Sequence, residues 1–242
     1  MCGTCGCEDK SIVPVDVQER ILSGNEKQAA HNRLHFTAGE VLAINVMGSP
    51  GAGKTAVLEA TARALAGRRT IGALAGDLAT ENDADRLKAA GIRARSITTG
   101  SACHLDAAMV HHALHLLAWN DLDYLFIENV GNLVCPAVYD LGQAANVVLL
   151  AVTEGEDKPL KYPVMFNKAD LVLITKTDLL PYLPDISVER MRESLGRVMP
   201  VPRVIELSAR TGQGLQPWID WLLRQERQIA PGPLTDVHHV HA

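Results

Sequence analysis

The chain has 242 residues, 47% of them hydrophobic, and a formal net charge of −5 at pH 7. This length and apolar content suit one large α/β domain with its own core. A negative chain without a basic stripe argues against nucleic acid as the main partner, and no apolar run is long enough to span a bilayer. Because no signal peptide pattern opens the chain, we expect a cytoplasmic protein whose five cysteines are metal ligands or reactive thiols rather than disulfides.

The first seven residues contain three cysteines in the spacing C-x-x-C-x-C, at Cys2, Cys5 and Cys7. No apolar pattern surrounds them, and a flexible Gly-rich segment can wrap one metal ion. Three thiolates, with the α-amine freed by removal of Met1 as a fourth donor, suit tetrahedral Zn²⁺ or square-planar Ni²⁺. The ligand types do not choose between these metals. The alternative is an incidental cysteine-rich terminus.

Residues 8–40 begin polar and then carry apolar positions at helical spacing, interrupted at Ser23-Gly24. We expect a linker followed by a helix that packs on the main domain. The chain is thereby divided into an N-terminal region at 1–40, a main domain at 41–230 and a histidine-containing tail at 231–242.

From residue 41 onward, apolar runs typical of buried strands alternate with helical patterns. Strands are predicted over 41–47, 70–75, 93–97, 123–127, 146–152, 170–175 and 203–207, and helices over 56–66, 83–90, 105–119, 188–198 and 215–228. This alternation predicts an α/β fold: a doubly wound, mostly parallel sheet with helices on both faces. Such sheets bind ligands at the carboxyl ends of their strands, so the residues after each strand are the candidates for a site.

The first strand is followed by the sequence GSPGAGKT and then by a helix. Strand, Gly-rich turn and helix form the context that the phosphate-binding loop G-x-x-x-x-G-K-[ST] requires. Backbone N–H groups of such a turn surround phosphate oxygens, and the helix N-terminus adds more. Lys54 can reach the outer phosphates, and the Thr55 hydroxyl can hold Mg²⁺ against them. The predicted loop residues are Gly48, Ser49, Pro50, Gly51, Ala52, Gly53, Lys54 and Thr55. A turn that binds nothing is the alternative.

Two acidic residues follow later strands, Asp77 after the second and Glu128 after the fourth. Either carboxylate can bind Mg²⁺ or its water shell, and either can instead cap a helix or a loop. Gly131 can let a backbone N–H turn toward the γ-phosphate, so that the segment from Glu128 acts as a switch that the γ-phosphate orders. We assign catalysis to Lys54, Thr55, Asp77 and Glu128, and Mg²⁺ to Thr55, Asp77 and Glu128. No residue offers itself as a general base, so slow hydrolysis is expected.

The segment 175–178, TKTD, follows the sixth strand and is similar to the guanine-binding motif [NT]-K-x-D. Asp178 can accept hydrogen bonds from N1–H and the 2-amino group of guanine, which adenine lacks. Losing one such charged hydrogen bond costs about 1.5–3 kcal/mol, so GTP is favoured over ATP by tenfold or more. The Lys176 stem can lie along the base, and Ser208 and Ala209 follow the last strand, where a backbone N–H can reach guanine O6. Thr175 stands where asparagine is commoner, which leaves its side-chain contact open.

A second group of potential metal ligands lies in the main domain. Cys103 and His104 precede the helix at 105–119, and Cys135 follows the switch candidate, on the same side of the sheet. Together they supply three ligands of a four-coordinate site, with the fourth position open or filled by another subunit. Histidines on a helix or a tail are more commonly surface or packing residues. This applies to His111, His112, His115, His238, His239 and His241.

Taken together, these motifs resemble the HypB family of hydrogenase nickel-incorporation GTPases. The matching segments are CGTCGC at 2–7, GSPGAGKT at 48–55, CHLD at 103–106, ENVGN at 128–132 with CP at 135–136, and KTD at 176–178. The resemblance implies a P-loop NTPase with a flexible N-terminal metal-binding tail. It implies that the terminal cysteines form a high-affinity nickel site, and that Cys103, His104 and Cys135 form a weaker nickel or zinc site. Ala108 stands where some relatives carry a further histidine, and a long histidine-rich stretch is absent.

The resemblance also implies a role: a metallochaperone that dimerises with nucleotide and metal, and that acts with HypA to deliver Ni²⁺ to the large-subunit precursor of [NiFe] hydrogenase. The expected cofactors are GTP, Mg²⁺, Ni²⁺ and Zn²⁺. Our hypothesis is that GTP state and metal affinity are coupled through the segment from Glu128 to Cys135.

Three alternatives remain open at this point. A urease accessory GTPase leaves the terminal cysteines and Cys103-His104 unexplained. A P-loop kinase for a small metabolite does not predict the motif from Lys176 to Asp178. A plain metal buffer with a vestigial nucleotide site would not turn over GTP.

Overall fold

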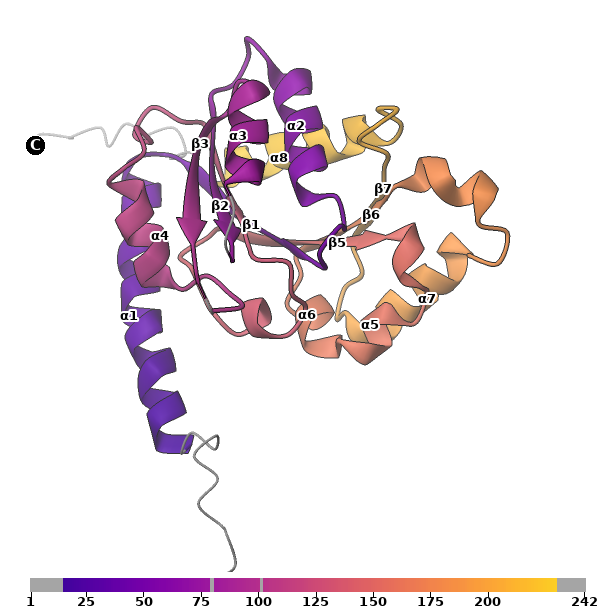
Figure 1. The fold of residues 1–242 in the computed structure, drawn as a ribbon, viewed down its shortest axis with the longest axis horizontal. Helices are drawn as coiled ribbons and strands as arrows, with labels where there is room; N and C mark the ends of the chain where they lie inside the picture. Colours follow the sequence, from indigo (N-terminus) through magenta and orange to yellow (C-terminus); the bar gives the residue numbers. More distant parts are fainter. Residues whose placement is uncertain (1–14, 79–80, 101, 230–242) are drawn as a thin grey trace, which may run out of the picture.

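The computed structural model describes residues 15–78, 81–100 and 102–229. The predictions for Cys2, Cys5, Cys7 and the C-terminal histidines therefore lie outside the described residues. Within them, seven parallel strands form one sheet in the order β3-β2-β4-β1-β5-β6-β7 (Figure 1). The strands are β1 (Leu42–Gly48), β2 (Ile71–Asp77), β3 (Arg93–Thr98), β4 (Tyr124–Glu128), β5 (Ala145–Ala151), β6 (Leu171–Thr175) and β7 (Val204–Glu206).

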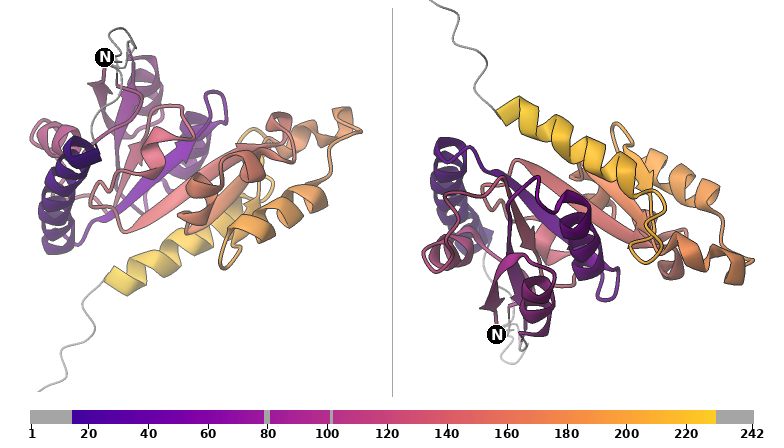
Figure 2. Two further views of the ribbon diagram at one scale, coloured as in Figure 1. Left: turned by 90° about the horizontal axis from the view of Figure 1, so that it is seen from below. Right: turned by 90° about the horizontal axis from the view of Figure 1, so that it is seen from above.

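Helices cover both faces of this sheet, which confirms the predicted doubly wound fold (Figures 1 and 2). The α-helices are α1 (Val15–Ala38), α2 (Lys54–Leu65), α3 (Asn82–Ala89), α4 (Ala107–Leu114), α5 (Lys158–Lys161), α6 (Pro163–Asn167), α7 (Val188–Val198) and α8 (Leu215–Ile229). Three short 3₁₀ helices are η1 (Cys135–Ala137), η2 (Val152–Glu154) and η3 (Thr177–Tyr182).

Alternate residues of β1 face opposite layers, as the period of a strand requires. Leu42, Ile44 and Val46 belong to the core under α2, α3 and α8, whereas Ala43, like Val41 just before the strand, belongs to a second core under α1 and α4. A third core packs α6 and α7 against β5 and β6. The chain runs outward from β1 first toward β3 and then, on the other side, toward β7, so the point where strand order reverses lies at β1. Ligands bind at that point in open α/β sheets.

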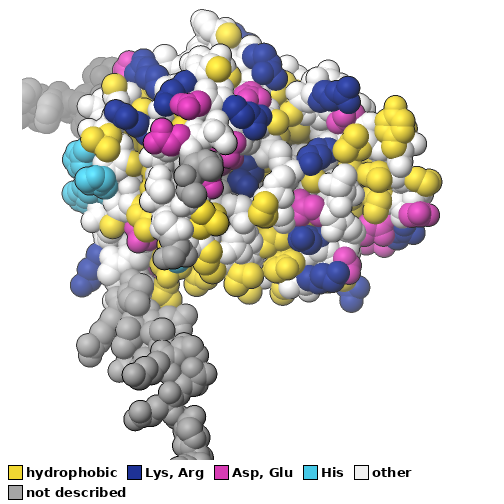
Figure 3. Space-filling model, in the orientation of Figure 1, with side chains coloured by type: hydrophobic (Ala, Val, Ile, Leu, Met, Phe, Trp, Pro, Cys, Tyr) yellow, Lys and Arg dark blue, Asp and Glu magenta, His cyan; other side chains and the backbone are white. Residues whose placement is uncertain are grey.

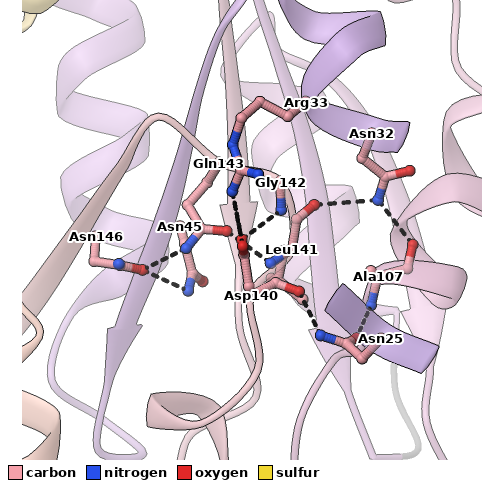
Figure 4. Close-up of polar contacts among 10 residues, drawn as sticks. All are labelled: Asn25, Asn32, Arg33, Asn45, Ala107, Asp140, Leu141, Gly142, Gln143 and Asn146. Carbon is pink, nitrogen blue, oxygen red and sulfur yellow. Dashed lines mark hydrogen bonds and ion pairs between the residues drawn. The ribbon is translucent and has the colours of Figure 1, made fainter. Parts of the chain in front are cut away.

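The N-terminal helix α1 differs from the expectation, because it runs through Ser23-Gly24 without a break. A glycine costs a helix about 1 kcal/mol, and tertiary contacts offset that cost here. Directly after it, the Asn25 side chain donates to the Asp140 carbonyl at 2.8 Å and accepts from the Ala107 N–H at 2.8 Å. Helix α1 thus packs along α4, as Figure 4 shows for these residues.

Two further differences concern helix lengths. The helix predicted over 105–119 is shorter, because Asp106 caps its start by accepting a hydrogen bond from the Met109 N–H at 2.7 Å, and α4 ends at Leu114. Helices α5 and α6 were not predicted, although each carries a proline near its start, Pro159 and Pro163, where proline is favoured. In the described part of the chain, no helix is both long and apolar enough to cross a bilayer.

Candidate functional site

A cavity of about 470 Å³ lies over the turn between β1 and α2, at the carboxyl ends of β1, β2 and β4. Gly53 caps α2 with a left-handed backbone (φ 95°), which a glycine adopts without strain. The predicted residues that line the cavity are Pro50, Gly51, Gly53, Lys54, Thr55, Asp77, Glu128 and Gly131. The structure therefore brings the candidate phosphate loop, acids and switch glycine to one place.

Lys54 is buried at the bottom of this loop. Its Nζ lies 3.4 Å from the carbonyl oxygens of both Gly48 and Ser49. Burial lowers the pKa of Lys54, while the nearby carboxylates of Glu128 and Asp83 act in the opposite direction. The ammonium group of Lys54 is surrounded by backbone carbonyls and carboxylates. It is placed to interact with an anion that binds at the loop.

The Thr55 hydroxyl stands between two carboxylates. Its Oγ1 lies 2.8 Å from Glu128 Oε1 and 2.8 Å from Asp83 Oδ1. We did not predict Asp83, which lies in the first turn of α3; the acidic run 81–85 after the second strand was the signal available. Asp77, which we did predict, lines the same cavity, and its Oδ1 accepts the Leu78 N–H at 2.6 Å.

Glu128 ends β4 and is almost fully buried. Burial raises its pKa to about 7, against opposing effects of Lys54 and the Thr55 hydroxyl. Its Oε2 finds no hydrogen-bond partner among the described residues. An orphaned carboxylate oxygen beside a hydroxyl and a second carboxylate is an oxygen-only donor set, which fits Mg²⁺.

We expect Glu128→Gln to stabilise the nucleotide-free protein at pH 8 by on the order of 2–3 kcal/mol, and by much less at pH 5. The folded protein keeps this proton up to about pH 7, whereas a glutamate of the unfolded chain loses it from pH 4.5. Stability is therefore lost as pH rises from 4.5 to 7 and stays lower above it. Glutamine keeps an oxygen for Thr55 and carries no charge. Denaturant unfolding of wild type and variant at both pH values measures the difference.

The matched control is Glu193→Gln on the exposed face of α7, which is expected to change little at either pH. An equal effect of Glu128→Gln at pH 5 and pH 8 would contradict the buried, protonated carboxyl.

A second cavity of about 340 Å³ adjoins the first, since Gly53 and Ala56 line both. It is also lined by Thr175, Lys176, Asp178 and Ala209. Ser208, predicted to lie near the base, is buried and does not line this cavity, but its hydroxyl donates to Asp178 Oδ1 at 2.6 Å and holds that carboxylate in place. Arg210 Nη1 lies 3.7 Å from Asp178 Oδ2.

The structure also shows what the unusual Thr175 contacts. Its hydroxyl donates to the carbonyl of Ala52 in the phosphate loop at 2.7 Å. This buried bond joins the end of β6 to the loop after β1, so the threonine side chain ties the two halves of the candidate nucleotide site together.

Cys103, His104 and Cys135 come together as a group that we call the Cys–His cluster. The two sulfur atoms lie 2.7 Å apart, and Cys103 Sγ lies 3.9 Å from His104 Nδ1. One ligand atom from each residue lies within 4.8 Å of the others. The His104 ring stacks on Tyr139 with centroids 3.9 Å apart, which orients the imidazole. Thiol and imidazole donors suit a borderline metal such as Ni²⁺ or Zn²⁺.

Protonation of the Cys–His cluster follows from this proximity. The hydrogen bond with Cys103, then burial, raises the pKa of Cys135. Burial lowers the pKa of His104, and Asp106 opposes that effect. A neutral imidazole is ready to act as a ligand, whereas the thiols must release a proton to do so.

The segment from Glu128 to Cys135 contacts both the phosphate loop and the Cys–His cluster. A Cβ added to Gly131 would lie 2.9 Å from the backbone nitrogen of Pro50, so a glycine is needed for this close approach. Asn132 pairs with Gly48 as an antiparallel bridge. Its side-chain amide donates to the Cys103 carbonyl at 3.2 Å. One residue therefore touches the loop after β1 and the loop that carries Cys103.

Comparisons with known proteins agree with this arrangement. A model of the CobW/HypB/UreG nucleotide-binding domain matches residues 42–206. The hydrogenase maturation factor HypB of Azotobacter vinelandii is 50% identical over 209 residues, which cover 86% of this chain and 69% of the relative.

Two crystal structures are similar to the chain over most of its length. The hydrogenase maturation factor HypB of Archaeoglobus fulgidus has a TM-score of 0.79 and 39% identity, covering 85% of this chain and 100% of the other. HypB of Helicobacter pylori in complex with nickel has a TM-score of 0.81 and 39% identity, covering 87% of this chain and 98% of the other.

Proposed function

This chain belongs to the CobW/HypB/UreG family, in its branch of HypB hydrogenase maturation factors, and on that premise we propose a nickel metallochaperone whose GTP site controls its metal site. We divide it into an N-terminal metal-binding region at 1–40, a GTP-binding domain at 41–230 and a tail at 231–242. The family supports nucleotide binding, and the relative in complex with nickel supports nickel as the cargo. The HypB relatives favour hydrogenase over urease and leave no support for a small-metabolite kinase.

In the proposed nucleotide site, the loop from Gly48 to Thr55 surrounds the phosphates with backbone N–H groups. Lys54 neutralises charge that develops on the transferred phosphoryl group. Asp178 selects guanine, with Lys176 along the base and the Ser208-Ala209 backbone near O6. The bond between Thr175 and Ala52 supports this site because it couples base and phosphate subsites.

Thr55 and Glu128, with Asp77 and Asp83 beside them, are the proposed holders of Mg²⁺. When bound, Mg²⁺ would offset negative charge on the phosphate oxygens. The chain's own residues would hold the oxygen ligands of Mg²⁺ in place and displace water from the site. Asp83 and Glu128 each place one oxygen 2.8 Å from the Thr55 hydroxyl, and we assign the open oxygen of Glu128 to Mg²⁺ rather than to a general base. We therefore propose slow hydrolysis.

The contacts of Gly131 and Asn132 carry the proposed coupling. The γ-phosphate would order the segment from Glu128, which abuts Pro50 and leads to Cys135. Moving Cys135 changes the distance between thiols in the Cys–His cluster and hence its affinity for Ni²⁺ or Zn²⁺. A nickel titration in the GDP form and in the form bound to a non-hydrolysable GTP analogue tests this. We expect the affinities to differ by about 5–150-fold, the usual range of coupling.

We expect Gly131→Ala to reduce that difference to less than about threefold, which is below the usual range of coupling. The added methyl group pushes the segment away from Pro50 and breaks the link, while the metal ligands stay. The control is Gly196→Ala in α7, where nothing lies within 4 Å of the added atom. Equal nickel affinities in both nucleotide states of the wild type would refute the coupling itself. The nickel titration is repeated with Cys135→Ser and with Cys2, Cys5 and Cys7 replaced. The variant that loses the nucleotide-dependent change in nickel affinity identifies the site that the titration measures.

The proposed partners follow from the family role: a HypA-type nickel chaperone, the hydrogenase large-subunit precursor, and a second copy of the chain in a nucleotide- and metal-dependent dimer. We propose that this takes place in the cytoplasm. Co-purification of the large-subunit precursor in the GTP state, and its loss with Cys135→Ser, would support the role.

A further inference from the structure

Four histidines converge between α1 and α4, on residues that the nickel mechanism above does not use. His31 and His35 lie one turn apart on α1, and His111 and His115 lie one turn apart at the end of α4. Residues at i and i+4 share one helix face, so each helix presents a pair. Figure 3 shows histidine side chains gathered on the surface at the edge formed by α1 and α4.

The four rings form a contiguous group with His111 in its centre. Nε2 of His31 lies 2.9 Å from Nε2 of His35, and Nε2 of His111 lies 3.2 Å from Nε2 of His115. Across the two helices, ring centroids of His31 and His111 are 5.1 Å apart, and those of His35 and His111 are 5.7 Å apart. One nitrogen each from His31, His35 and His111 lies within 4.8 Å of the others.

The two helices that carry these pairs are held in a fixed relation. The Asn32 side chain, fully buried on α1, donates to the carbonyls of Ala107 at 2.8 Å and Leu141 at 3.1 Å. Asn25 adds the bonds to Ala107 and Asp140 described above, and Figure 4 shows both asparagines reaching across from α1. Because this anchor lies one turn from the histidines, the group is preassembled rather than gathered by a ligand.

We propose that His31, His35, His111 and His115 bind one divalent transition metal ion, Ni²⁺ or Zn²⁺, at a site separate from the Cys–His cluster. Imidazole ligands select such ions over Mg²⁺ or Ca²⁺, which prefer oxygen. Metal–nitrogen bonds of about 2.0–2.1 Å place tetrahedral ligand nitrogens roughly 3.4 Å apart. The pairs at 2.9 and 3.2 Å are close to that spacing. His31, His35 and His111 already lie within reach of one ion, and His115, which contacts only His111 of the three, completes the set by a movement of its ring.

The proposed histidine site and the Cys–His cluster lie at opposite ends of helix α4. Helix α4 carries Cys103-His104 just before its start and His111 and His115 at its end, roughly 10 Å along the helix. An ion bound by the four histidines would thus lie near an ion in the Cys–His cluster. Because His31 and His115 are exposed, the ion at the histidines would be open to exchange with solvent. The same ion would also tie α1 to α4.

The test uses the full chain with all five cysteines changed to serine, so that the thiol sites are removed. Equilibrium dialysis with Ni²⁺, and separately with Zn²⁺, is expected to find an ion that the double variant His31→Gln/His35→Gln binds at least about tenfold more weakly. The double variant His111→Gln/His115→Gln is expected to show the same loss. In the chain with its cysteines intact, each double variant is expected to bind one ion fewer, which keeps the test valid if the serine variant does not fold.

His112→Gln is the matched control, because it lies on the same helix next to His111 and is exposed. It is expected to leave the ion in place, as is replacement of His238, His239 and His241 by glutamine. Unchanged binding in either double variant, equal loss with His112→Gln, or loss with the tail variant alone would overturn the proposal. GTP hydrolysis is expected to be unchanged in the histidine variants of the chain with its cysteines intact, which separates this result from the proposed coupling.

Discussion

Lys54→Ala is expected to lower the rate of GTP hydrolysis by about 10²–10³-fold, the usual effect of removing one preorganised electrostatic donor from a transition state. The ammonium is buried beneath the loop, where little water screens it. Burial already lowers its pKa, and nearby Glu128 and Asp83 favour the charged form. Phosphate oxygens would favour the charged form of Lys54 further. We therefore expect Lys54 to be protonated in the transition state, when negative charge moves onto the phosphate oxygens.

Single-turnover phosphate release with Mg²⁺·GTP measures this effect. A separate GDP titration shows how much of the loss comes from weaker binding of the nucleotide in the ground state. Lys161→Ala is the matched control, because this exposed lysine pairs with Asp157 on the surface of α5. A decrease of less than tenfold for Lys54→Ala would show that the loop does not hold the reacting phosphate.

Asp178→Asn is expected to weaken GTP binding by about 10²-fold or more. The carboxylate would accept two hydrogen bonds from guanine, each worth about 1.5–3 kcal/mol, and about 1.4 kcal/mol is a factor of ten. Ser208 holds Asp178 in place before the base arrives, so the loss is not recovered by movement. Asparagine offers an N–H where guanine also offers one, and that mismatch disfavours GTP further.

The same substitution is expected to improve binding of xanthosine triphosphate, whose 2-oxo group accepts the asparagine N–H. Competition titrations with GTP, ATP and xanthosine triphosphate measure the change. Asp185→Asn, at an exposed position beyond the cavity, is the control. If GTP binding survives and xanthosine triphosphate gains nothing, then guanine does not sit against Asp178.

Much of the fold and of the candidate nucleotide site could be predicted from short stretches of sequence. The alternation of apolar runs defines seven strands because each run is a local signal. The loop from Gly48 to Thr55 is contiguous, so spacing alone places its N–H groups, its lysine and its hydroxyl relative to each other. Asp178 follows the same logic at the end of β6. Parallel strands end at one edge, and this brought Cys103 and Cys135 together as expected.

Other features depend on contacts between segments far apart in the chain. Asp83 meets Thr55 only because α3 packs beside α2, and Gly24 stays helical because Asn25 is bonded to α4 and its neighbouring loop. The pairing of His31 and His35 with His111 and His115 is of the same kind. A sequence period shows which face of a helix is buried, but not which other helix lies against it. That choice is made by the packing of the whole core, and so only the tertiary structure decided where these side chains meet.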